Sequence, residues 1–442
     1  MTVTLDIAAR SRAVSWDALA PSAQHAARLC LADGLAVMLG ALRLEPAVQP
    51  FQTQARLYGH GPAPLLAGGT APAPAAALAN GALAHALDFE DTFDRAGLHV
   101  NAAVIPTVLA LGPDKPLAEV LRALILGADL ACRIGLSLTR DPATRGWYHP
   151  PMIGAFGAAF AGTLLLGLDD ERTVTALSLT QAQFALSDAL KRSPASDLRA
   201  VRDGFAARAA TEAVMLAQAG VTGTTDPVAE DGGLVHMMTG AAPDPAPFAD
   251  VGNPVLATDV TLKPWPCCRG THRAIALALD LRAQGVAPAD LHDVAFDVAP
   301  PDDMLFSPRA DRIRPTTAIA AKFSIPFCFA SAILHGAPGL LAFDDAARQD
   351  PDRLALAQRA CLASCAPGTT PTARLTWANG TQDVRPLPDP PEMRAGDTPF
   401  ARLTPKFTDC VGRSGALDML LSLETADPAL PVATLLAGLA PA

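Results

Sequence analysis

The chain has 442 residues, of which 50% are hydrophobic and only 18% are charged, so it can build a large core and is not expected to be disordered. This length fits two domains. The formal net charge of −10 disfavours a nucleic-acid partner, which would usually leave a basic footprint. It does not exclude an anionic small molecule, because a local cluster of Arg and Lys can bind one on an acidic protein.

Neither the first residues nor the longest apolar run indicates a membrane protein. Residues 1–16, MTVTLDIAARSRAVSW, lack the apolar core of a secretory signal peptide. Residues 150–168, PPMIGAFGAAFAGTLLLGL, approach the roughly 20 residues that span a bilayer. However, two prolines open this run, four glycines dilute it and DDERT follows directly, so we expect a buried helix packed through small residues. We predict a soluble, cytoplasmic protein without a membrane partner.

The eight cysteines show no pair of CxxC motifs and no Cys/His spacing typical of zinc sites. Cys361 and Cys365 in CLASC fit one helical face. Without a secretory signal, we expect the thiols to be reduced and mostly buried, and we predict no metal site formed by cysteines.

Apolar positions recur at helical spacing through about the first 250 residues. The pattern is clear in residues 22–42, 117–138, 171–190 and 197–220, and the last of these ends at Gly220, as a helix often does. Strand-like alternation is hard to find here. We therefore expect a succession of helices.

The pattern changes near residue 255. Residues 259–266 and 290–300 are predicted strands, with a helix over 271–284 between them, and residues 318–336 are a further predicted helix. Residues 373–388 are predicted to form a hairpin that turns at Asn379-Gly380, residues 386–399 a linker, and residues 400–442 helices. The predicted fold is mainly α: a large all-helical domain over 1–255, completed by 396–442, with an inserted smaller α+β domain over 256–395.

Residues 85–99, HALDFEDTFDRAGLH, concentrate charge within an apolar region. The stretch holds four carboxylates and a histidine at each end: His85, Asp88, Glu90, Asp91, Asp94 and His99. If the preceding helix runs through Thr92, then His85, Asp88 and Thr92 share one helical face and could offer a general base and a hydroxyl, with His99 arriving from the loop beyond. The alternative is a solvated acidic helix end with His85 in the core. The spacing matches neither a calcium loop nor HExxH, so a metal site is disfavoured.

Residues 261–280, TLKPWPCCRGTHRAIALALD, carry a second group of candidates. Gly270 permits a tight turn and Thr271 is a suitable N-cap for the helix that follows. Helix N-termini attract anions. The cations crowded at this end are Lys263, Arg269, His272 and Arg273. We expect an anion-binding corner; ordinary capping with surface cations is the alternative. Cys267 and Cys268 are expected to be buried rather than reactive.

Two further segments each allow two interpretations. His149 lies between a tyrosine and two prolines in GWYHPPMIGAFGAA, where it is either catalytic or structural. Arg199 and Arg202 lie one helical turn apart, and either could bind a substrate carboxylate through two hydrogen bonds. Surface arginines are the alternative.

These pieces occur together in a recognisable order. NGALAHALDFEDT with the following histidine and AAVIP, GWYHPPMIGAFGAA, KPWPCCRGTH, KFSIPFCFASAILHG and TPFARLTPKFTDC cover nearly the whole chain. The set resembles the MmgE/PrpD family, which includes 2-methylcitrate dehydratase, cis-aconitate decarboxylase and iminodisuccinate epimerase. The resemblance implies a helical domain, an α+β lid with the active site between them, a homodimer, and acid/base chemistry on small di- or tricarboxylates without a metal or organic cofactor.

The resemblance also implies site residues. Asp88, Thr92 and His99 match the family's first active-site segment, with one extra residue before His99; His149 matches the histidine before the glycine-rich helix, and Lys263 the lysine that opens the lid motif.

Three positions depart from the pattern of the decarboxylase. Arg199 stands for a lysine, Cys268 for a histidine and Phe327 for a tyrosine. Arginine keeps the charge but is a poor proton donor, which disfavours cis-aconitate decarboxylation.

The function predicted is a cofactor-independent hydro-lyase that resembles 2-methylcitrate dehydratase. His99 or His149 would act as general base or acid, assisted by Asp88 and Thr92. The predicted substrate-binding residues are Arg199, Lys263, Cys268, Arg269, Thr271, His272 and Phe327. The alternatives are an epimerase or isomerase of an amino- or imino-dicarboxylate, a carboxylate-binding protein without catalysis, and a metal-dependent hydrolase that uses the acidic cluster.

Overall fold

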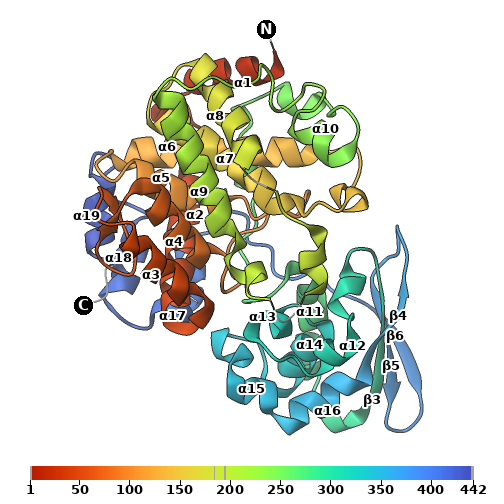
Figure 1. Cartoon of the computed structure of the whole chain (residues 1–442). Coiled ribbons are helices and arrows are strands. Elements are labelled where there is room, and N and C mark those ends of the chain that lie inside the picture. The colour runs from red at the N-terminus through yellow and green to blue at the C-terminus, as the bar shows by residue number, and fades with distance from the viewer. Residues whose placement is uncertain (1, 184, 194–195, 440–442) are drawn as a thin grey trace.

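The computed structural model describes residues 2–183, 185–193 and 196–439 (Figure 1). It confirms a mainly α fold with a smaller α+β domain. The helices of the first part are α1 (Val3–Arg12), α2 (Pro21–Leu44), α3 (Gln49–Leu57), α4 (Ala73–Ala84), α5 (Asn101–Leu111), α6 (Leu117–Leu136), α7 (His149–Leu165), α8 (Asp170–Gln183), α9 (Leu198–Gln218) and α10 (Leu234–Thr239). A short antiparallel ribbon, β1 (Ala63–Pro64) and β2 (Thr70–Ala71), interrupts them.

The apolar run at 150–168 is a buried helix, as expected. Almost every residue of α7 is buried, and the helix packs against α5, α6 and α9. Small residues allow the close approach: a Cβ added at Gly157 would lie 2.6 Å from the carbonyl oxygen of Gly127 on α6. Within the described part of the chain, no helix combines the length and apolar character that crossing a membrane requires.

Helix α4, which leads into the acidic stretch, is fixed closely on α9. A Cβ added at Gly204 would lie only 2.5 Å from the carbonyl oxygen of Leu78, so only glycine fits at this crossing without displacing the α4 backbone. The crossing therefore sets where the chain leaves α4 and enters the loop that follows.

The α+β domain lies at the lower right of Figure 1. Its helices are α11 (His272–Ala283), α12 (Arg309–Ile313), α13 (Ala318–Lys322), α14 (Ile325–His335), α15 (Asp345–Gln349) and α16 (Pro351–Arg359), and its strands are β3 (Leu291–Val298), β4 (Ala360–Cys365), β5 (Thr372–Trp377) and β6 (Gln382–Pro386). The sheet order is β4-β3-β5-β6, with β4 parallel to β3 and the other pairs antiparallel. The predicted hairpin around Asn379-Gly380 is confirmed as the β5–β6 connection.

Three expectations about local structure are wrong. Residues 259–266 form no strand; Thr261 makes isolated bridges instead. Cys361 and Cys365 lie in strand β4 rather than on a helix, because the segment pairs with β3. Residues 318–336 form two helices rather than one, because the Ser324 hydroxyl caps a new helix, accepting a hydrogen bond from the Phe327 amide.

The chain returns to the helical part after β6. Helices α17 (Thr404–Val411) and α18 (Gly415–Ser422) pack against α2, and α19 (Val432–Ala437) follows. Figure 1 shows these blue helices beside the red and orange ones of the N-terminal part. Residues 440–442 of the predicted helical tail lie outside the described residues. The domain boundaries at 255/256 and 395/396 stay a prediction.

Both segments that join the two parts run past the acidic stretch. Thr261, on the way into the α+β domain, forms antiparallel bridges with Thr92 and with Arg394, which lies on the way back. The Thr92 and Thr261 backbones exchange two hydrogen bonds, each 2.8 Å. We call this three-stranded contact the seam. It holds the 85–99 loop against the base of the α+β domain.

Candidate active site

The acidic stretch is a folded loop and not a helix. Helix α4 ends at Ala84, so His85, Asp88 and Thr92 do not share a helical face, and that expectation is wrong. The chain turns sharply at Asp88, whose φ of 50° is the one left-handed value of a non-glycine residue among those described. This turn directs the following residues inward, where most of them are buried.

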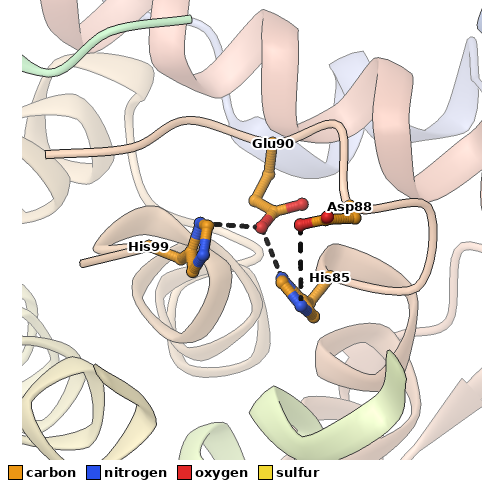
Figure 2. Close-up of side chains that lie close together, drawn as sticks. All are labelled: His85, Asp88, Glu90 and His99. Carbon is orange, nitrogen blue, oxygen red and sulfur yellow. Dashed lines mark hydrogen bonds and ion pairs between the residues drawn. The ribbon is translucent and has the colours of Figure 1, made fainter. Parts of the chain in front are cut away.

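Four side chains of this loop form a buried cluster, His85, Asp88, Glu90 and His99 (Figure 2). Glu90 Oε1 contacts Nδ1 of His85 and lies 2.9 Å from Nδ1 of His99. His85 Nε2 lies 3.9 Å from Asp88 Oδ1. We call this group the Glu90 cluster.

Lys263 reaches the Glu90 cluster from the α+β side. Its Nζ lies 2.7 Å from Asp88 Oδ1, 3.0 Å from the Asp88 carbonyl oxygen and 3.7 Å from Glu90 Oε1. Burial opposes the charge of Lys263, but Asp88 and Glu90 outweigh it and raise its pKa above the usual value. A charged ammonium therefore balances two buried carboxylates.

The Glu90 cluster also has the composition of a metal site. One ligand atom from each of its four residues lies within 4.8 Å of the others. Imidazole and carboxylate suit several divalent ions. However, a cation bound there would compete with the Lys263 ammonium for Asp88 and Glu90. The donor set therefore fits the lysine already present better than an additional metal ion.

The pKa values in the loop diverge strongly. Burial, helped by the charge of Arg202, lowers the pKa of His85 to about 3. Burial would raise the pKa of Glu90, but His85, Lys263 and His99 together hold it well below its usual value. Burial and the charge of Glu90 raise the pKa of Asp91 to about 7. Near neutral pH, Glu90 is thus ionised beside a neutral His85.

A cleft of about 840 Å³ opens beside the Glu90 cluster. Its lining from the helical part includes Thr92, Asp94, His99, Tyr148, His149, Lys191 and Arg199, and from the α+β domain Cys268, Arg269, Arg273, Asp302 and Phe323. Only His99 of the Glu90 cluster lines the cleft. The cleft therefore lies between the two parts of the molecule and has histidines and cations in its wall.

Arg199 contributes a positive charge to the wall of the cleft. Its guanidinium lies 3.5 Å from the ring centroid of Phe323, and its Nη1 donates to the Lys191 carbonyl oxygen over 3.3 Å. Its buried Nε has no hydrogen-bond partner within the described ranges. Arginine stays protonated in proteins. Because Arg199 lines the cleft, a carboxylate that enters would meet a permanent positive charge there.

The expected anion corner around residue 270 is largely neutralised. Arg269 donates to the carboxylate of Asp94 from Nε, at 3.0 and 3.1 Å, and from Nη2, at 2.8 Å, and Arg273 lies 2.5 Å from Asp389. Thr271 is the N-cap residue of α11, as expected, but its side chain makes no capping hydrogen bond: its hydroxyl donates to the Cys268 carbonyl oxygen over 2.8 Å.

The predicted site residues thus fall into two groups. Those that line the cleft are Thr92, His99, His149, Arg199, Cys268 and Arg269; those that do not are Asp88, Lys263, Thr271, His272 and Phe327. Asp88 and Lys263 lie in contact directly behind His99's partner Glu90. Thr271 and His272 are buried around the start of α11, and Phe327 packs on Phe343 and Arg353 in the core.

Three residues of interest escaped the sequence reasoning. Glu90 was one of four carboxylates, and nothing in its spacing distinguished it. Tyr148 lines the cleft and precedes His149 directly, so that neighbour was a usable signal. Lys191 also lines the cleft and forms an ion pair of 2.8 Å with Asp188, but no local pattern marks it.

Two groups of the cleft wall, His149 and Cys268, are uncharged near neutral pH. Burial lowers the pKa of His149, the first residue of α7, to about 4, so its imidazole is uncharged near neutral pH. Burial raises the pKa of Cys268 to about 12, which keeps this residue a thiol. His149 is therefore available as a proton acceptor, whereas Cys268 is a poor nucleophile.

Two buried histidines, His85 and His149, should each reduce the stability of the protein in mild acid. The pKa values of His85, about 3, and His149, about 4, both lie below the ordinary value of 6.5. As the pH falls from about 6.5 to 4, the unfolded chain binds protons at both positions and the native chain does not, so these two groups lower the free energy of unfolding. Carboxyl groups whose pKa burial raises, among them Asp91 at about 7 and Asp302 at about 6, act in the opposite direction, so the contribution of a histidine is measured from its own variant.

Denaturant unfolding measured at several pH values between 7 and 4 checks this prediction. Glutamine at residue 149 cannot bind the proton that histidine takes up in the unfolded chain. The free energy of unfolding of His149→Gln should therefore fall less steeply with acid, by about 1.4 kcal/mol per pH unit below pH 6. An unchanged slope in this variant would show that His149 is already protonated in the native protein or that it stays accessible to water.

Comparisons with known proteins agree with this architecture. Residues 6–246 match the MmgE/PrpD N-terminal domain and residues 265–363 match the MmgE/PrpD C-terminal domain. A cis-aconitate decarboxylase-like protein of Aspergillus oryzae is 26% identical over 286 residues, which cover 59% of this chain and 58% of that protein. Cis-aconitate decarboxylase of Mus musculus is 28% identical over 231 residues, 48% of this chain and 44% of that protein, and the Homo sapiens enzyme is 27% identical over 222 residues, 48% and 45%.

The matched stretches thus span between 44% and 58% of these relatives' own lengths. The two domain matches, by contrast, lie in chain order on the helical part and on the α+β domain, and the first alone covers more than half of the chain. On these matches, the chain belongs to the MmgE/PrpD family.

Proposed function

We propose that the protein is an enzyme that acts on a small di- or tricarboxylate by acid/base chemistry, without a metal or organic cofactor. The observation that carries the proposal is that His99 and His149 line the same cleft as the guanidinium of Arg199. Arg199 would bind a substrate carboxylate, and a neutral imidazole would remove the proton from the adjacent carbon. The names of the relatives, which are cis-aconitate decarboxylases or similar to them, support a carboxylate as substrate.

His99 is the base in this proposal. Its Nδ1 is held at 2.9 Å from Glu90 Oε1 and 3.0 Å from the Asp91 carbonyl oxygen, so Nδ1 donates and Nε2 is left to accept a proton. Thr92 lines the cleft, and its buried hydroxyl has no hydrogen-bond partner among the described residues; we propose that this residue helps to orient the substrate. Asp88 and Lys263, which do not line the cleft, would act indirectly, through the charge balance of the Glu90 cluster.

The reaction we propose is the loss of water, as in 2-methylcitrate dehydratase. His99 takes the proton from carbon, the enolate-like intermediate is stabilised by the charge of Arg199, and the hydroxyl group leaves with a proton from an acid. Arg199 is too basic to be that acid. Tyr148, whose hydroxyl-bearing side chain lines the cleft, is the donor we propose.

An epimerase of an amino- or imino-dicarboxylate is the second candidate. One observation favours it: two histidines line one cleft, so one could remove the α-proton while the other returns a proton to the opposite face. A dehydratase and an epimerase differ in product, since only the dehydratase changes the mass of its substrate.

The test is a proton-exchange screen in deuterated water. The purified protein would be incubated with citrate-like, succinate-like and amino-dicarboxylate compounds, and followed by NMR and mass spectrometry. Loss of water supports the dehydratase, and exchange of the α-proton without loss of water supports the epimerase. Binding without either, by folded protein, would instead favour a carboxylate-binding protein without catalysis.

Arg199 gives a sharper prediction once a substrate is known. Arg199→Met removes a charged hydrogen-bond donor from the cleft, and we expect KM to rise roughly 10- to 100-fold. Arg208→Met on the same helix α9 is the matched control, because Arg208 does not line the cleft. An unchanged KM in the Arg199 variant would contradict its role in carboxylate binding.

The homodimer implied by the resemblance and the cytoplasmic location expected from the sequence also belong to this proposal. Analytical ultracentrifugation tests the first: a species of twice the chain mass of 45.6 kDa is expected.

A further inference from the structure

Glu90 connects two histidines through a single oxygen atom. Its Oε1 contacts Nδ1 of His85 and lies 2.9 Å from Nδ1 of His99 (Figure 2). Glu90 and His85 are fully buried, whereas the His99 side chain is 14% exposed and lines the cleft. The contact therefore runs from the protein interior to the wall of the cleft.

The acceptors around His99 fix its tautomer. Both neighbours of His99 Nδ1 are oxygen acceptors, Glu90 Oε1 and the Asp91 carbonyl oxygen, so Nδ1 carries the hydrogen. In the neutral ring Nε2 then holds the lone pair. When Nε2 takes a proton, the ring becomes positively charged within hydrogen-bond distance of an ionised carboxylate, which stabilises that charge.

His85 serves as the anchor of this carboxylate. Its Nδ1 faces Glu90 Oε1 and therefore donates to it, and its ring centroid lies 4.9 Å from that of His99. Because burial keeps His85 neutral, it holds Glu90 in place without cancelling its charge. Lys263, at 3.7 Å, is farther from Glu90 Oε1 than His99 is.

We propose that Glu90 is a positioning residue for His99: it selects the Nδ1–H tautomer, aims Nε2 at the substrate and stabilises the imidazolium formed by proton transfer. The proposal rests on the proposed function in one respect, the role of His99 as base. The other reading is that Glu90 only compensates Lys263, in which case His99 would not respond to its removal.

Several charged groups face Glu90 and bear on any pH dependence. They are His85, Asp88, Asp91 and His99 on its own loop, Asp33 on α2, Arg202 and Asp203 on α9, Lys263 before α11 and Lys322 on α13. The substitution Glu90→Gln leaves all of them in place and removes one negative charge at Oε1.

The experiment compares the full chain with Glu90→Gln, Glu90→Asp and the control Asp129→Asn. Asp129 is an equally buried carboxylate, but its side chain bonds Arg133 and the Leu256 amide and no histidine. The titration of His99 is followed by NMR of the histidine-labelled protein, with its signal assigned from a His99→Gln sample. This readout requires no substrate.

We expect Glu90→Gln to move the titration midpoint of His99 down by at least about one pH unit, because one pH unit corresponds to a tenfold loss of imidazolium stabilisation. With an active substrate, kcat should fall about 100-fold with KM nearly unchanged, and the acid limb of the pH profile should move to lower pH. Glu90→Asp, which keeps the charge but is one methylene shorter, should recover part of both effects. Asp129→Asn should change neither.

An unmoved His99 midpoint in folded Glu90→Gln would overturn the proposal. If that variant does not fold, Glu90→Asp decides. Its carboxylate is one methylene shorter and should position His99 less well, so a wild-type His99 midpoint together with a wild-type kcat in this variant would equally overturn the proposal. If the wild-type protein turns over no carboxylate, the proposed function fails, and the His99 midpoint alone still decides whether Glu90 positions His99.

Discussion

Replacement of His99 by glutamine is expected to lower kcat for the carboxylate substrate by about 100-fold or more, which is the usual contribution of a general base. The reason is geometric: within the described residues, His99 is the one member of the Glu90 cluster that reaches the cleft, and its Nδ1 is already engaged. Steady-state kinetics with the compound identified by exchange measures the effect.

A matched control separates this effect from a general loss of structure. His335 lies at the end of α14 with its side chain 54% exposed, away from the cleft, so His335→Gln should retain wild-type turnover. Circular dichroism and thermal unfolding establish that both variants fold. Wild-type kcat in folded His99→Gln would remove His99 as base and leave His149 as the remaining imidazole of the cleft wall.

Replacement of Lys263 by methionine is expected to cost about 3–5 kcal/mol of the free energy of unfolding. Lys263 and Asp88 are both fully buried, and the lysine ammonium is the nearest cation to Asp88 Oδ1, at 2.7 Å. Methionine fills a similar volume but removes the one ammonium in direct contact with Asp88 Oδ1, and a buried carboxylate that loses its paired charge is expensive. Denaturant unfolding at pH 7 measures the difference.

An exposed pair supplies the comparison for this second variant. Lys115 lies 3.5 Å from Glu119 with side chains 40% and 51% exposed, so Lys115→Met should change stability by less than about 1 kcal/mol. A loss in Lys263→Met as small as in the control would mean that Asp88 takes up a proton or that water reaches the Glu90 cluster. In that case the lysine would not be its main source of positive charge.

The helical part was predictable from sequence because its signals are local. Residues 117–138 and 197–220 repeat apolar side chains at helical spacing, and α6 and α9 lie there. The hairpin at Asn379-Gly380 carries its own turn residues. By contrast, the strand at Ala360–Cys365 depends on pairing with β3, about 65 residues away in the chain. The local sequence CLASC does not reveal that this distant segment will pair with it.

The candidate site was likewise predictable only where its signals are local. That residues 85–99 contribute polar side chains was visible in their composition, but the end of α4 at Ala84 was not, because alanine, leucine and histidine before Asp88 continue the helical pattern. The pairs Lys263–Asp88 and Arg269–Asp94 each join positions 175 residues apart. The sequence does not show which distant residue a charged side chain will pair with. For this reason it could not show that the cations expected to bind an anion near residue 270 are largely paired with carboxylates of the same chain.

The seam has a consequence for the construction of chimeras between relatives. Thr92, Thr261 and Arg394 pair side by side, so the two crossing segments and the 85–99 loop form one hydrogen-bonded unit although they are distant in sequence. A graft of the α+β domain alone would bring a foreign partner to Thr92 and a foreign counterpart of Lys263 to Asp88. The transferable module is therefore discontinuous: it comprises the α+β domain together with residues 85–99, and a crossover made at the seam cuts through the site itself.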